Sequence, residues 1–165
     1  MITKTAGISK ISVLKLLIKL GAVILILLFV ASPYRVSGNY MSPSMNDGDL
    51  VITSKLTSYE TGSIVLYRNV SGKLVLGRIA ASGGQTVSYL EGGGYTVDGY
   101  LPYEKEYLDT ADAPEEDPDP VTLGKNQYFI LNDQRSDQDD SRTTGPVNKK
   151  QICGTVVSLF RFRNF

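Results

Sequence analysis

A chain of 165 residues allows one modest domain with an appendage. Residues 1–35 hold five of its 17 Lys and Arg and none of its 17 Asp and Glu, which leaves 12 basic against 17 acidic residues in the rest, a net charge of −5. This acidic remainder excludes a basic nucleic-acid-binding surface, so we expect no nucleic-acid partner. The sequence contains no His and therefore no Ser-His-Asp triad, and its single cysteine, Cys153, excludes an internal disulfide.

An apolar segment follows the basic N-terminus. Leu20 to Ala31 is unbroken, and extension to residues 16–34 gives a helix of ~28 Å, close to the ~30 Å hydrocarbon core of a bilayer. Basic residues near a span stay in the cytoplasm. This predicts a cytoplasmic tail (1–15), a transmembrane helix (16–34) in the cytoplasmic membrane and an extracellular domain (35–165). The alternative is a cleaved signal peptide, but small residues are poorly placed for cleavage there.

The remainder of the chain shows the patterns of β-strands. Alternating, β-branched segments occur at 49–56, 62–68, 73–81, 85–90, 95–102, 127–133 and 152–162, with Gly, Asn, Asp and Ser between them. Asp98-Gly99 is a favoured two-residue hairpin turn. We therefore predict a mostly β domain, an antiparallel β-barrel behind a single N-terminal transmembrane helix.

Two acidic stretches interrupt this pattern. Residues 109–120 hold six acids and three prolines, which predicts a mobile acidic surface loop. Residues 132–142 contain four acids and three amides beside two arginines, but EF-hand spacing fails and no central glycine is present, so we expect pairing of Asp140 with Arg142. We expect no metal and no other cofactor.

The C-terminal sequence "LFRFRNF" alternates aromatic and basic residues. One interpretation places Phe160 and Phe162 in the core with the arginines solvated. The other makes this segment a membrane-contact patch, because aromatic side chains and arginines suit an anionic lipid interface.

Four blocks in order resemble bacterial type I signal peptidases, which are membrane-anchored serine proteases with a Ser/Lys dyad. "VSGNYMSPSMNDGDLV" is similar to the family's Gly-x-Ser-Met-x-Pro loop with its later Gly-Asp, and "GSIVLYR" to a following strand. "GRIAASGGQTV" is similar to the segment that begins with Lys-Arg, and "LNDQRSDQDDSRTTGPV" to the family's Gly-Asp-Asn-Arg and Asp-Ser-Arg segment. The resemblance implies a mostly β domain with a peptide-binding groove.

The register of these blocks places other residues where the family has its dyad. Gly38, Pro43 and Gly48 all fit the first motif, and the nucleophile position then falls on Tyr40. In the third block the general-base position falls on Gly77. A glycine supplies no base, and a phenol without one is a poor nucleophile. The resemblance thus implies a non-catalytic, pilus-assembly-associated member of the family.

The resemblance also implies which residues form the site and which partners it serves. It implies a chaperone or assembly factor for secreted protein chains, pilin subunits polymerised by a sortase, in a Gram-positive membrane. Peptide or partner binding falls on Tyr40, Met41, Pro43, Gly77, Arg78 and Ile79, with structural support from Asp133, Arg135, Asp140 and Arg142.

Three alternatives stay open at this point. The first is an active signal peptidase that uses Ser42 or Ser44 with an unidentified base. The second is a membrane-tethered interaction domain unrelated to secretion. The third is sequence drift in a gene that is being lost, although drift would be expected to erode the scaffold residues and the site alike.

Overall fold

The computed structural model describes residues 10–90, 94–102 and 119–161. Most of the predicted mobile loop at 109–120 lies outside these ranges, as do Phe162 and the residues after it.

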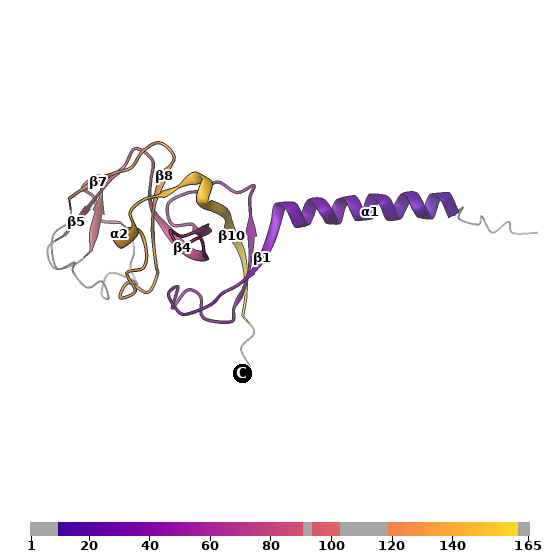
Figure 1. Cartoon of the computed structure of the whole chain (residues 1–165), viewed down its shortest axis with the longest axis horizontal. Helices are drawn as coiled ribbons and strands as arrows, with labels where there is room; N and C mark the ends of the chain where they lie inside the picture. Colours follow the sequence, from indigo (N-terminus) through magenta and orange to yellow (C-terminus); the bar gives the residue numbers. More distant parts are fainter. Residues whose placement is uncertain (1–9, 91–93, 103–118, 162–165) are drawn as a thin grey trace, which may run out of the picture.

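Helix α1 (Lys10–Val30) begins before the predicted span and projects from the β domain (Figure 1). It ends where strand β1 (Ala31–Arg35) begins, so the last residues of the predicted segment 16–34 are extended. Pro33 lacks the amide hydrogen that a continuing helix needs, which favours this change. In the ranges that the structure describes, no helix combines the length and apolar character of a membrane span.

The domain is mostly β, as predicted (Figure 1). Seven strands correspond to the predicted segments, with β4 reaching one residue beyond its own: β2 (Leu50–Ser54), β3 (Ile64–Arg68), β4 (Leu74–Ser82), β5 (Thr86–Tyr89), β6 (Tyr95–Val97), β8 (Gln127–Leu131) and β10 (Ile152–Phe160). The sequence did not predict β1 or the two-residue strands β7 (Val121–Thr122) and β9 (Val147–Asn148). Two short helices complete the part of the fold that the structure describes, α2 (Ser141–Thr144) and η2 (Lys149–Gln151).

The strands form two antiparallel sheets. One has the order β1-β2-β10-β3-β4-β8-β9 and the other the order β6-β5-β7. Among the described residues the larger sheet therefore ends at β1 and β9, so it is a curled antiparallel sheet with two edges where the sequence predicted an antiparallel β-barrel. The predicted hairpin is present: Asp98 and Gly99 both have positive φ, and Val97 bridges Tyr100.

Apolar side chains cover both faces of the larger sheet. On one face Leu66 and Leu76 pack against Met41 and Met45 from the loop between β1 and β2. The opposite face carries a second cluster that contains Tyr67, Ile79 and Ile130. A third cluster fills the space beneath the smaller sheet and includes Val87, Tyr95, Leu123 and Phe129. Both faces of the larger sheet are buried. Successive side chains of β3 and β4 therefore pack alternately into the cluster on one face and the cluster on the other.

The end of β10 differs from the interpretation that placed Phe160 in the core. Phe160 is 49% exposed, while its neighbour Leu159 packs against the Met41 cluster. A register shift between Val156 and Ser158 changes the phase of alternation, which explains the difference. Arg161 is not simply solvated, since its Nη2 donates to the carbonyl oxygen of Ser44 at 2.8 Å.

Candidate functional site

The loop between β1 and β2 carries the predicted nucleophile position and closes on itself. Two main-chain hydrogen bonds join the ends of the loop. Val36 N donates to Asp49 O at 2.8 Å, and Gly48 N donates to Val36 O at 2.9 Å. Gly38 and Gly48 adopt positive φ, which favours glycine at these turns. Met41 is fully buried beneath the loop, so it anchors the loop and does not face a partner, whereas Pro43 is exposed.

Tyr40 extends from this loop to strand β4. Its hydroxyl oxygen accepts a hydrogen bond from Leu76 N at 3.4 Å. Burial raises the pKa of Tyr40 to about 12, against the smaller opposite effect of the Leu76 hydrogen bond. The side chain is therefore a neutral phenol at physiological pH. Because this folded-state pKa lies above the ordinary value of 10, the linked stability is present below pH 10 and is lost as the pH rises through 12.

Gly77 follows Leu76 directly, so the two positions predicted from separate sequence blocks meet at the same point of β4. A Cβ atom built on Gly77 would lie 2.4 Å from Cγ2 of Ile130 and 3.1 Å from Cε1 of Tyr67. Ile130 is fully buried and its branched methyl group has little freedom to move. The space that a side chain at this position would enter is already occupied by the second apolar cluster, to which Ile79 also belongs.

Arg78 holds the site together from the other face of β4. Its guanidinium makes a two-pronged ion pair with Asp133, with Nε to Oδ1 at 2.7 Å and Nη2 to Oδ2 at 2.6 Å. It also donates to the Gly62 carbonyl at 2.7 Å and to Ser44 Oγ at 3.2 Å. An arginine remains protonated in proteins, so it cannot accept a proton from Ser44.

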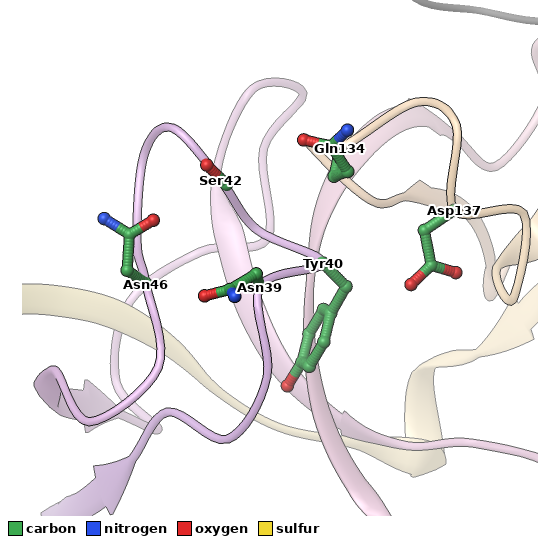
Figure 2. A pocket seen from close by; sticks show the side chains of 6 residues that line it. All are labelled: Asn39, Tyr40, Ser42, Asn46, Gln134 and Asp137. Atoms are coloured by element: carbon green, nitrogen blue, oxygen red, sulfur yellow. The ribbon is translucent and has the colours of Figure 1, made fainter.

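Ser42 faces a shallow polar cavity of about 540 Å³. Figure 2 shows the Ser42 hydroxyl and the Tyr40 ring pointing away from each other on this loop. The described residues around the cavity include one carboxylate, Asp137, and no lysine; the complete lining is Asn39, Tyr40, Ser42, Asn46, Gln134 and Asp137. The structure thus places no amine base beside Ser42 in the part of the chain that it describes.

The turn after β8 is stabilised by the predicted pair of Asp140 and Arg142. Arg142 Nη2 lies 2.7 Å from Asp140 Oδ2, and Asp140 also accepts from Asn132 N at 2.9 Å and caps α2. Arg142 donates to the carbonyl oxygens of Arg135 and Asp137, both at 2.7 Å. The Arg135 guanidinium lies 5.8 Å from the centre of the Tyr95 ring. These contacts fix the turn that carries Asp133.

Two residues near Tyr40 did not follow from the sequence. Tyr34 donates its hydroxyl hydrogen to Leu74 O at 2.8 Å, a contact hidden by the assignment of residue 34 to a helix. Lys73 lies directly before β4 and lines, with Tyr34 and Tyr40, a second cavity of about 330 Å³. Its side chain is exposed.

Comparison with known proteins identifies the family. Residues 10–161 match the family model described as signal peptidase, peptidase S26. The chain belongs to this signal peptidase family. The family resemblance predicted from the four blocks is therefore confirmed.

Similar members of the signal peptidase family come from Staphylococcus aureus and Enterococcus faecalis. An "Inactive signal peptidase IA" of Staphylococcus aureus (strain COL) is 31% identical over 156 residues, which cover 87% of this chain and 89% of the relative. A "Signal peptidase IB" of Staphylococcus aureus (strain Mu50 / ATCC 700699) is 28% identical over 156 residues, which cover 83% of this chain and 80% of the relative. A crystal structure of a signal peptidase I from Enterococcus faecalis V583 aligns with this chain with a TM-score of 0.51 at 20% sequence identity. The alignment covers 62% of this chain and 100% of the Enterococcus chain, and it shows that the two share a fold.

Replacement of Gly77 by Ala should destabilise the domain by about 1–3 kcal/mol, because the new methyl group overlaps Ile130. Ile130→Leu removes the overlapping branched methyl group at a modest cost. In a double-mutant cycle measured by chemical denaturation, the Gly77→Ala/Ile130→Leu variant should therefore lose less free energy of unfolding than the sum of the losses in the two single variants. Additive losses would show that Ile130 does not fill the space at Gly77.

Removal of the Asp133 carboxylate should be among the most damaging single changes at the site. Asp133→Asn leaves the Arg78 guanidinium without its counter-ion in a mostly buried position, with an expected loss of roughly 3–5 kcal/mol in the free energy of unfolding. Arg161→Gln is the matched control and should cost under about 1 kcal/mol, since the Arg161 side chain is half exposed and its ion pair with Asp49 is 4.0 Å long. Equal losses for the two variants would contradict this ranking.

Proposed function

We propose that this protein is a non-catalytic signal-peptidase-like assembly factor that holds secreted chains without cutting them. The observation that carries the proposal is the contact of Tyr40 with Leu76 N beside Gly77, whose missing side chain is replaced by Ile130. In the register of the family motif, both positions of the Ser/Lys dyad thus hold residues that cannot supply its chemistry. The similarity to a relative named inactive supports the same conclusion.

The alternative with relocated catalytic residues finds little support in the geometry. Ser44 accepts a hydrogen bond from a permanent cation, Arg78. Ser42 has one carboxylate, Asp137, among the described residues around its cavity, and the family's chemistry needs an amine. The similarity to a relative named signal peptidase IB keeps an experimental test necessary.

The proposed setting is the cytoplasmic membrane of a Gram-positive bacterium. The apolar segment 16–34 behind a basic tail supports a single membrane anchor with the β domain outside. The proposed partners are pilin subunits and the sortase that joins them, because the family resemblance associates non-catalytic members with this assembly. An extended partner segment would bind by β-augmentation, in which main-chain hydrogen bonds supply affinity without any catalytic group.

The purified full chain in detergent should not cleave a signal-peptidase substrate. Tyr40→Ser should restore nothing, because Gly77 supplies no base, and Tyr40→Ser with Gly77→Lys should also stay inactive, because Ile130 blocks the lysine. Cleavage would be followed by gel electrophoresis and mass spectrometry. Turnover by the unmodified chain that disappears on Ser42→Ala or Ser44→Ala would establish the relocated-catalysis alternative in place of this proposal.

In the bacterium that carries this gene, its deletion should leave pilin subunits secreted but unpolymerised. The unmodified gene should restore the high-molecular-weight ladder of pilin polymers on a denaturing gel, and so should the Ser42→Ala/Ser44→Ala double variant, since neither hydroxyl acts. An unchanged ladder after deletion would remove pilin assembly from the proposal.

A further inference from the structure

Strand β4 has an open edge beside Tyr40. Its pairing with β3 runs from Leu74 to Arg78, whereas its pairing with β8 begins only at Arg78. Leu74–Gly77 therefore have a strand on one side only, among the residues that the structure describes. An unpaired edge presents main-chain N–H and C=O groups that can bind another strand.

Two tyrosine hydroxyls occupy that edge. Tyr34 donates to Leu74 O at 2.8 Å, and Tyr40 accepts from Leu76 N at 3.4 Å. Leu74 and Leu76 are two residues apart, so their main-chain groups point to the same side of the strand, away from β3. The Tyr34 hydroxyl donates as the N–H group of a neighbouring strand would, and the Tyr40 hydroxyl accepts as its C=O group would. A residue of a parallel strand, or two alternate residues of an antiparallel one, would bond to the same two atoms.

The two hydroxyls come from different segments and support one another. Tyr34 lies on β1 and Tyr40 on the following loop, and both rings pack against the cluster that contains Met41. Both hydroxyls bond main-chain groups of the same strand, which brings the two side chains together at one edge. Tyr34 thus joins β1 to β4, strands that are separated by β2, β10 and β3 in the sheet.

Space for a chain segment lies next to this edge. Leu74 and Val75 line the cavity of about 330 Å³ together with Tyr34 and Tyr40. Movement of the two rings would therefore connect the main chain of β4 to an existing cavity. Most of the remaining lining is polar, which suits an extended main chain whose own N–H and C=O groups need partners.

We propose that Tyr34 and Tyr40 form a plug that satisfies the open edge of β4 until an extended protein segment displaces both hydroxyls and pairs with Leu74–Leu76. This rests on the proposed function, because it assigns a closing device to the groove that holds secreted chains. Binding then exchanges two internal hydrogen bonds for two intermolecular ones, so the net gain is small and the captured segment is readily released. In this proposal Tyr40 covers the open edge of β4, a role separate from the absence of a serine at its position.

The test compares the full chain in detergent with its Tyr34→Phe/Tyr40→Phe double variant, which keeps both rings and removes both hydroxyls. The probe is a capped, fluorescein-labelled eight-residue peptide of alternating Ala and Thr, followed by fluorescence anisotropy. The double variant should bind the probe roughly three- to tenfold more tightly, as expected when ordinary competing hydrogen bonds are removed. Tyr100→Phe, at a tyrosine that is 78% exposed, is the matched control and should bind like the unmodified chain.

A second readout detects the plug without a peptide. The Leu76 amide should exchange its hydrogen faster in the double variant than in the unmodified chain, and saturating probe should slow that exchange again. If the double variant does not fold, Tyr40→Phe alone is measured in both assays. Unchanged affinity and unchanged Leu76 exchange, or no probe binding by any variant, would overturn the plug. Neither assay involves pilins, so these results are independent of whether deletion of the gene affects pilus assembly.

Discussion

The ion pair of Arg78 with Asp133 is the constraint on which the rest of the site depends. It joins β4 to the turn after β8, and the same guanidinium reaches Gly62 before β3 and Ser44 in the loop after β1. A buried ion pair is favourable only when its remaining hydrogen-bonding groups are also satisfied, and these contacts meet that condition. One side chain of β4 therefore fixes the loop that carries Tyr40 and the turn that borders its cavity.

At Tyr40 and Gly77, the positions that the family resemblance assigns to the dyad, the structure shows a hydrogen bond and close packing. The Tyr40 phenol is held by main chain at Leu76 N, and Ile130 fills the volume that a side chain at Gly77 would need. Both replacements are compatible with a stable core, since neither leaves a void or a buried polar group without a partner at that point. Under the proposed function, one substitution would not restore catalysis, because Ile130 fills the space at Gly77.

An open strand edge serves a chain-holding protein as well as it serves a protease. Main-chain pairing recognises an extended segment regardless of its detailed sequence, and catalysis is a separate property of side chains nearby. Exposed edges also invite unwanted pairing, which proteins limit by covering them. Coverage of β4 by the hydroxyls of Tyr34 and Tyr40 reconciles these two demands, because hydroxyl groups satisfy the edge and still leave by a side-chain rotation.

The mostly β class, seven of the strands, the family and the pairing of Asp140 with Arg142 could all be predicted from the sequence. Each of these features depends on a few neighbouring residues, through the alternation of apolar and polar residues, the residue types of a turn or a short motif. The contact of Tyr34 with Leu74, 40 residues away, and the filling of the space at Gly77 by Ile130 became visible only in the folded protein. These contacts depend on the curl of the sheet, its bulges and the extension of β1, which arise from strand register over the whole sheet. No local pattern encodes them, because a residue's alternation shows which face it occupies but not which distant side chain it will find there.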